Sequence, residues 1–96
     1  MLTGKAKRYL RSLAMQEEPI FQIGKGGLND TIVRELSDAM EARELIKVRV
    51  LNNCEATPQK LAAEITAKTG AFLVQIIGHN MVFFRPSSKK PRIQLP

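Results

Sequence analysis

The sequence has few of the residues that form disulfides or bind metal ions, and it has no apolar run long enough to span a membrane. It contains one cysteine, Cys54, and one histidine, His79, which excludes a disulfide within the chain and a metal site built from these residue types. No apolar run approaches the ~20 residues of a membrane-spanning helix, and the first residues lack the apolar core of a signal peptide. We therefore expect a cytoplasmic protein with no metal and no cofactor, in which Cys54 is a half-buried apolar residue.

Aromatic residues are also scarce, because they make up only 5% of the chain and tryptophan is absent. Phe72, Phe83 and Phe84 lie in apolar segments, where core packing is the expected role. Since neighbours in a strand alternate between faces, one of Phe83 and Phe84 must point away from the main core. The sequence therefore predicts no cluster of exposed aromatic residues on a sheet.

No grouping of serine, cysteine, histidine and aspartate matches a catalytic motif. His79 stands between glycine and asparagine, which is typical of an exposed turn residue, although such a side chain can also contact RNA. The sequence therefore predicts no enzyme, no catalytic residue and no small-molecule substrate.

Charge, in contrast, is plentiful and unevenly distributed. The 15 lysines and arginines outnumber the 9 acids, and the net charge is +6. Five of the nine acids lie within residues 30–44. No acid follows Glu64, and the charged residues among residues 1–11 are all cations. A basic side and an acidic side are the pattern of a protein that presents one face to a polyanion, with nucleic acid first and an anionic membrane second.

Apolar periodicity predicts one α/β domain in the order helix-strand-helix-strand-helix-strand-strand. The expected helices cover residues 5–15, 30–43 and 58–70, after the capping residues Thr3, Asn29 and Thr57, and the expected strands cover residues 19–23, 46–50, 71–77 and 81–85. We expect two layers, with three helices and a mixed four-stranded sheet. Residues 71–77 are apolar on both faces, which favours a central strand. Residues 1–86 form the domain, and residues 87–96 read as a basic, flexible tail.

The segment Gly24-Lys25-Gly26-Gly27 joins an expected strand to a capped helix. Three glycines in four positions indicate a backbone that needs unusual dihedrals or close approach to a partner. A phosphate chain can lie against such a loop, with Lys25 as a mobile cation at its tip. The spacing does not match a Walker A loop or a dinucleotide fingerprint. The alternative is a tight strand-to-helix turn that merely exposes a lysine.

An ordered set of motifs resembles one family, the CRM (chloroplast RNA splicing and ribosome maturation) domain, in its bacterial stand-alone, YhbY-like form. The motifs are Gly24-Lys25-Gly26-Gly27-Leu28, Ile46-Lys47-Val48-Arg49-Val50, Gly70-Ala71 through Ile77-Gly78, and Phe83-Phe84-Arg85-Pro86. The likeness covers about residues 2–86. The family's Gly-x-x-Gly loop falls on Gly24 and Gly27.

The resemblance implies a fold similar to the C-terminal domain of translation initiation factor three. It also implies binding to ribosomal RNA or its precursor during large-subunit assembly. The RNA-binding residues expected from the loop and the cations are Gly24, Lys25, Gly26, Gly27, Leu28, Lys5, Lys7, Arg8, Arg11, Lys47, Arg49 and Arg85.

Two other functions remain open from the sequence. The acidic helix over residues 30–43 suits a protein-interaction adaptor that docks a partner. The first helix suits a peripheral membrane binder, but its apolar stripe of two leucines and two alanines is too thin for strong insertion. We therefore expect RNA as the partner and no membrane association.

Overall fold

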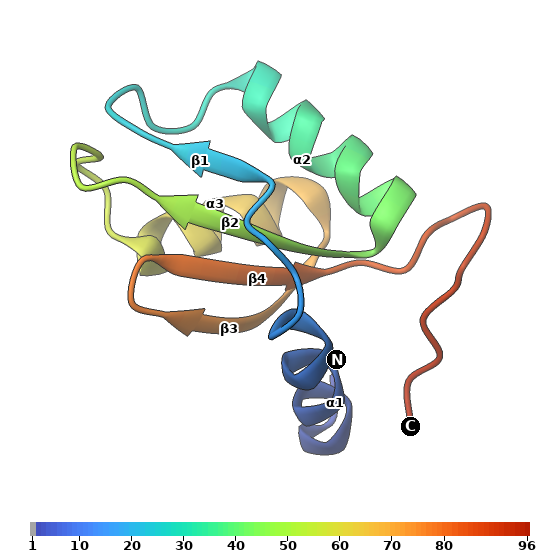
Figure 1. Cartoon of the computed structure of the whole chain (residues 1–96). Helices are drawn as coiled ribbons and strands as arrows, with labels where there is room; N and C mark the ends of the chain where they lie inside the picture. The colour runs from blue at the N-terminus through green and yellow to red at the C-terminus, as the bar shows by residue number, and fades with distance from the viewer. Residues whose placement is uncertain (1) are drawn as a thin grey trace.

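The computed structural model describes residues 2–96, which form three helices and four strands (Figure 1). The helices are α1 (Gly4–Ala14), α2 (Asp30–Arg43) and α3 (Pro58–Thr69), and the strands are β1 (Phe21–Ile23), β2 (Leu45–Val50), β3 (Phe72–Ile77) and β4 (Asn80–Phe84). The predicted element order is confirmed. None of the helices in this described part of the chain is long and apolar enough to cross a membrane.

Side-chain caps determine where each helix begins. The Thr3 hydroxyl accepts the backbone N–H of Ala6 at 3.0 Å, and the Asn29 side chain accepts that of Ile32 at 2.8 Å. Thr57 caps α3 in the same way, ahead of a proline at the first helical turn. Each cap satisfies one of the amide donors that a helix leaves without an internal partner. All three caps were predicted from the sequence.

The four strands form one mixed sheet in the order β1-β2-β4-β3. The β1–β2 pair is parallel, while β4 pairs antiparallel with both β2 and β3. The mixed sheet is confirmed, but the prediction that residues 71–77 are central is wrong, because β4 lies between β2 and β3. Apolar residues occur on both faces of β3 for another reason: helices cover both faces of this edge strand.

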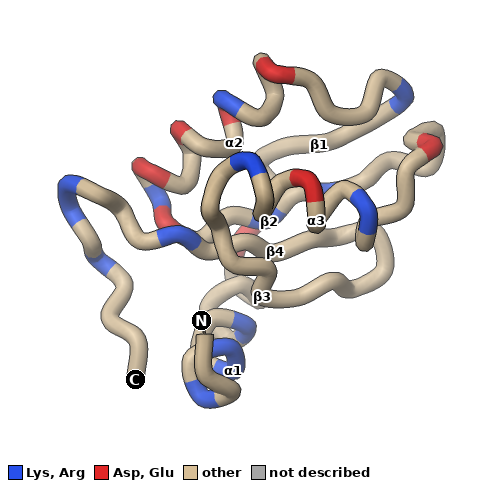
Figure 2. Tube along the Cα trace, turned by 180° about the vertical axis from the view of Figure 1, so that it is seen from behind, with Lys and Arg blue, Asp and Glu red and all other residues tan. Residues whose placement is uncertain are grey.

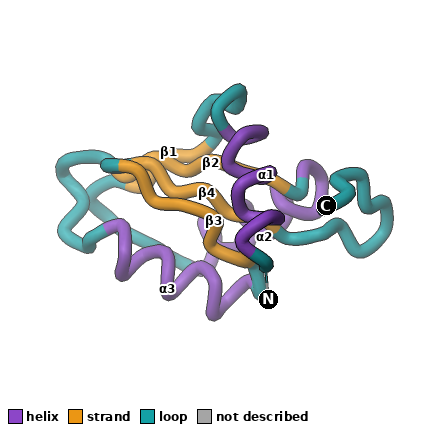
Figure 3. Tube along the Cα trace, turned by 90° about the horizontal axis from the view of Figure 1, so that it is seen from below, coloured by secondary structure: helices purple, strands orange, loops and turns teal. Residues whose placement is uncertain are grey.

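Each face of the sheet carries its own apolar cluster. The larger cluster joins β2 and β4 to α2 and α3 through residues such as Leu36, Val48, Ile65 and Phe83. The smaller cluster lies on the opposite face, where Leu10 of α1 packs with Val82 and Phe84. Phe83 and Phe84 thus point to opposite faces, as predicted. Figure 3 shows α1 and α3 on different sides of the sheet, so α1 adds a partial third layer to the two expected layers.

The chain beyond β4 is held against the C-terminal end of α2 (Figure 1). Glu44, the C-cap of α2, is only 1% exposed, and its φ of 69° lies in the left-handed region. Its carboxylate accepts the backbone N–H groups of Ser87 at 2.9 Å, and of Arg92 and Ile93 at 2.7 Å each. Three donors converge on one buried carboxylate, so Glu44 is the anchor of a contact that we call the tail clasp (Glu41 and Glu44 with residues 87–93).

Glu41 completes the tail clasp. The Ser87 hydroxyl, together with the backbone N–H and hydroxyl of Ser88, lowers the pKa of Glu41 from 4.5 to about 2. Burial raises the pKa of Glu44, but its three backbone donors and the charge of Arg92 more than offset this, and its pKa falls below 4.5. Both acids are therefore held in the charged form. The flexibility of residues 87–96 stays a prediction, whereas these hydrogen bonds had no signal in the sequence.

Candidate nucleic-acid interface

The glycine loop (Gly24–Gly27) between β1 and α2 is a tight turn, and its glycines meet different structural demands. The Gly27 N–H donates to the Gly24 carbonyl at 2.9 Å, and Gly27 has a φ of 64°, which only glycine adopts readily. A Cβ on Gly24 would lie 3.3 Å from Asn53 Oδ1 and 3.4 Å from a Leu51 methyl group, so this position is tight. A Cβ on Gly26 would meet nothing within 4 Å. The outer glycines of the Gly-x-x-Gly pattern are thus required by the backbone and the packing.

The loop presents Lys25 to solvent and is anchored behind it. Lys25 and Gly26 are exposed, while the half-buried Leu28 packs against the larger apolar cluster. Asp30 stands exposed in the first turn of α2 and already complements the positive end of that helix. The anion-binding potential therefore lies at the turn and at Lys25 rather than at the helix end itself.

Two further turns lie at the same end of the molecule (Figure 1). The turn after β2 contains the exposed Asn52 and Asn53, and the turn between β3 and β4 contains the exposed His79. The Leu51 N–H donates to the Ile23 carbonyl at 2.8 Å, and the Val50 N–H donates to the His79 carbonyl at 2.7 Å. These bonds tie the three turns together. The exposed side chains of Asn52 and Asn53 therefore lie beside the glycine loop.

The strand register arranges polar residues in rows on the face that carries α1. Cross-strand partners form three rows. The row at the loop end consists of Gln22, Arg49, Asn80 and Ile77, and the middle row consists of Lys47, Val82 and Gln75. The row at the far end consists of Leu45, Phe84 and Phe72. In the part of the chain that the structure describes, α1 buries the far row in the smaller cluster. The other two rows lie next to α1 and bring Lys47 and Arg49 into one surface with it. We call these two rows the open sheet face.

Helix α1 adds cations beside the open sheet face. Arg8 and Arg11 are exposed and border a hollow that Gln75 and Ile77 of β3 also line. Lys5 is exposed in the first turn, and Lys7 is half-buried, with its carbonyl accepting from Arg11 Nε at 3.4 Å. Arg8 and Arg11 are thus the α1 cations that join the sheet surface, while Lys5 lies nearer the start of the helix.

Arg85 is engaged within the fold. Its guanidinium donates to the Ser37 hydroxyl at 2.9 Å, to the Ser37 carbonyl at 2.7 Å and to the Thr69 carbonyl at 2.9 Å. These bonds hold the last turn of α3 against α2. The sequence offered Arg85 as an RNA contact, but its geometry favours a structural role, so we leave it out of the interface proposed below.

Acidic residues are concentrated on α2, although this helix also carries Arg34 and Arg43. Figure 2 shows the acidic positions along α2, whereas the charged positions of α1 are all basic. Helix α2 packs on the face opposite to α1. Within residues 2–96, no group of three His, Cys, Asp or Glu side chains is placed to hold a metal ion. The chemistry gathered here is therefore that of cationic and amide hydrogen-bond donors on one surface.

The chain matches a known family over nearly its whole length. The model of the CRS1 / YhbY (CRM) domain matches residues 2–85. The chain belongs to the CRM domain family. The resemblance drawn from the glycine loop and the strand motifs is thereby confirmed, and the likeness to translation initiation factor three stays a prediction.

Curated relatives and a solved structure are similar to the chain over nearly its whole length. The chain is 48% identical to "Probable RNA-binding protein YqeI" of Bacillus subtilis over 96 residues, which covers 100% of both chains. It is 38% identical to an "RNA-binding protein" of Haemophilus influenzae over 95 residues, covering 99% of this chain and 95% of the other. The solution structure of the hypothetical protein SAV1595 from Staphylococcus aureus superposes with a TM-score of 0.82 at 50% identity, covering 100% of both chains.

Proposed function

We propose that this CRM domain is a non-enzymatic RNA-binding protein that assists assembly of the large ribosomal subunit by binding ribosomal RNA or its precursor. The observation that carries the proposal is the distribution of charge, in which the charged residues of α1 and of the open sheet face are all cations, while four of the nine acids lie on α2. RNA carries a dense row of phosphates that such a surface attracts. The relatives in Bacillus subtilis and Haemophilus influenzae are named RNA-binding proteins, which supports the same partner class.

In this proposal the glycine loop and the cations bind the sugar-phosphate backbone. Lys25 reaches one phosphate as a mobile point charge, and the glycines keep side chains out of the way. Arg49 and Lys47 continue the track along β2, and Arg8 and Arg11 extend it along α1. The full set is Gly24, Lys25, Gly26, Gly27, Leu28, Lys5, Lys7, Arg8, Arg11, Lys47 and Arg49. Leu28 acts through its backbone, because its side chain packs inward.

Charge reversal tests which surface binds RNA. We expect Arg8→Glu with Arg11→Glu to weaken binding and to flatten the slope of log K against log salt by about 1.4 to 1.8, or about 0.7 to 0.9 per phosphate contact. The matched control, Glu35→Gln with Asp38→Asn, changes two exposed charges on α2 and should leave the slope unchanged. Filter binding across a salt series measures both. The reversal lowers the net charge by 4 and the control raises it by 2, so tighter binding with a steeper slope in the control would mean that net charge, rather than this surface, governs binding.

The ribosomal part of the proposal needs its own experiment. Tagged protein should sediment with precursor large subunits on a sucrose gradient, and ultraviolet crosslinking should recover ribosomal RNA. The reversed variant should return to the top of the gradient, because it lacks the phosphate contacts. A partner that stays bound after nuclease treatment, and that is lost in the α2 control variant, would instead favour a protein-interaction adaptor that uses α2.

A further inference from the structure

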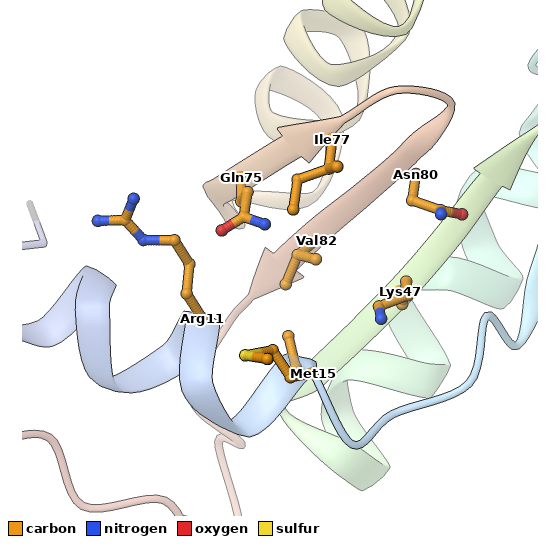
Figure 4. Close-up of a pocket in the computed structure, with 8 residues that line it drawn as sticks. Arg11, Met15, Lys47, Gln75, Ile77, Asn80 and Val82 are labelled. Carbon is orange, nitrogen blue, oxygen red and sulfur yellow. The ribbon is translucent and has the colours of Figure 1, made fainter.

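A hollow lies between the C-terminal end of α1 and the open sheet face (Figure 4). Its volume is about 100 Å³, and Arg11, Met15, Lys47, Gln75, Ile77 and Asn80 line it, with Val82 among the remaining lining residues. A second hollow, lined by Arg8, Arg11, Met15 and Ile77 among others, adjoins it. The lining combines apolar side chains, carboxamides and cations, and each of these needs an explanation.

Two large apolar side chains stand exposed at this hollow. Met15 is 83% exposed and Ile77 is 63% exposed, although both belong to a surface rich in cations. A single exposed apolar residue needs no explanation. Two that border the same hollow offer a flat or flexible partner an apolar surface that is already free of covering side chains. Methionine suits such a role because its side chain adapts to the shape of what it contacts.

Two carboxamides supply a polar edge next to these apolar groups. Gln75 and Asn80 both line the hollow, and in Figure 4 the Asn80 amide lies on the same side as Lys47. Among the described residues, Asn80 Oδ1 is a shielded side-chain acceptor that lacks any hydrogen-bond partner. Leaving such an acceptor unpaired costs free energy, which the Asn80 carboxamide recovers only when it turns its shielded oxygen toward a donor on a ligand. Carboxamides both donate and accept, and they match the mixed edges of nucleobases.

The charges around the hollow indicate the rest of the ligand. Arg11 borders it from α1 and Lys47 from β2, and within residues 2–96 none of the side chains that line it is acidic. An apolar peptide or a second copy of this basic surface would leave these cations without anionic partners. A nucleotide satisfies all three features, since it has an apolar ring face, a polar ring edge and a phosphate on each side.

We infer that the hollow binds one unstacked base of unpaired RNA. The ring packs against Met15 and Ile77, its edge meets the carboxamides of Gln75 and Asn80, and the flanking phosphates lie near Arg11 and Lys47. The hollow of about 100 Å³ is smaller than the ~150 Å³ closed cavity that holds a benzene ring, so it takes one edge of a base while the rest of the ring lies on the exposed surface of Met15 and Ile77. The inference rests on the proposed RNA binding and adds a substrate class to it.

Unpaired segments are then the preferred substrate. A paired base in an A-form duplex keeps its edge and its faces engaged, whereas a base in a loop or bulge can turn outward. Phosphate contacts alone bind both kinds of RNA. The hollow therefore discriminates between them, although the phosphate track supplies most of the affinity.

The test removes the apolar surface and compares two RNAs of the same length. Met15→Ala with Ile77→Ala should weaken binding of single-stranded polyuridine about three- to tenfold, a range typical of losing part of one base contact. Binding of a perfect RNA duplex and the salt slope should not change, because every phosphate contact remains. Leu95→Ala is the matched control, since Leu95 is 38% exposed and lies outside the hollow. Fluorescence anisotropy measures affinity, and an unchanged thermal midpoint verifies folding.

A crosslink provides a second readout. Polyuridine that contains 4-thiouridine, irradiated on the parent protein, should label peptides that carry Met15 or residues 72–77. The proposal that the hollow binds a base is overturned if the double variant binds polyuridine as tightly as the parent does. It is also overturned if the double variant loses as much affinity for the duplex as for polyuridine. A parent dimer that dissociates on Ile77→Ala in sedimentation equilibrium overturns it as well, because the hollow is then an interface between copies. If the parent binds neither RNA, the proposed function itself fails.

Discussion

A substitution at Glu44, the anchor of the tail clasp, should lower the free energy of unfolding although it removes no apolar contact from the core. Glu44→Gln keeps the size of the side chain but replaces one carboxylate oxygen with an amide group. That oxygen, Oε2, accepts from the buried Ser87 N–H, while Oε1 accepts from Arg92 and Ile93. In the variant the introduced amide group faces the Ser87 N–H, so two donors oppose each other. The hydrogen bonds from the Arg92 and Ile93 N–H groups remain, but their acceptor is no longer charged and they become weaker.

The magnitude follows from these three bonds. An unsatisfied buried donor costs about 1–3 kcal/mol, and each hydrogen bond to a charged group is worth more than one to a neutral group. Water can reach the exposed Arg92 and reduces the loss there, so we expect the free energy of unfolding to fall by about 2 kcal/mol in total. For a domain of this size that corresponds to a thermal midpoint lowered by roughly 8–16 °C.

Two measurements check this prediction. Thermal unfolding followed by circular dichroism compares Glu44→Gln with Glu35→Gln, an exposed position on the same helix, which should shift the midpoint by little. Amide hydrogen exchange then asks whether residues 87, 92 and 93 are protected in the parent and lose protection in the variant. Equal midpoints in the two variants, or unprotected amides in the parent, would refute the reasoning and would favour a tail that is flexible throughout.

The remaining predictions concern pH and the glycine loop. Because the folded-state pKa of Glu41 is lowered from 4.5 to about 2, its stabilising contribution is present above pH 4.5 and is lost as the pH falls toward about 2; acid titration should show Glu41→Gln losing this part of the pH dependence. Gly27→Val should weaken RNA binding more than it weakens folding, because its side chain stands where the loop otherwise lets the sugar-phosphate backbone approach, in addition to resisting a φ of 64°; an affinity equal to that of the parent in filter binding would contradict the loop's role. Lys25→Ala should keep its midpoint and flatten the salt slope by about 0.7 to 0.9, equally for unrelated RNA sequences, so a loss confined to one sequence would indicate base readout instead.

The helices, the strands and the glycine turn were predicted well because residues close together in the sequence determine them. Thr3, Asn29 and Thr57 cap the helices that they precede, and α2 begins and ends at the predicted residues. The Gly24–Gly27 turn was also visible, since glycine at such density has few structural explanations. In each case the residues that determine the conformation are within a few positions of one another.

Features that depend on distant pairing were not predictable in the same way. An apolar strand covered on both faces by helices reads like a central strand, which is why β3 was misplaced. The bonds of Arg85 to Ser37 join residues 48 positions apart, and those of Glu44 to Ile93 span 49. The sequence shows such residues only as charges, so Arg85 was predicted to contact RNA and Glu44 counted as one of the five acids within residues 30–44. The hollow was missed for the same reason, because Met15, Ile77 and Asn80 meet only in the folded sheet.

The position of β4 has a consequence for how the domain forms during synthesis. The strand that emerges from the ribosome last is the one that pairs with both β2 and β3. Until residue 84 is outside the exit tunnel, β3 has no neighbour in the sheet, and the β1–β2 pair is left with an unprotected edge. The surface that combines Lys47, Asn80 and Ile77 does not exist before that moment. A nascent chain therefore carries the cations of α1 without the complete sheet beside them until β4 has paired with both of its neighbours.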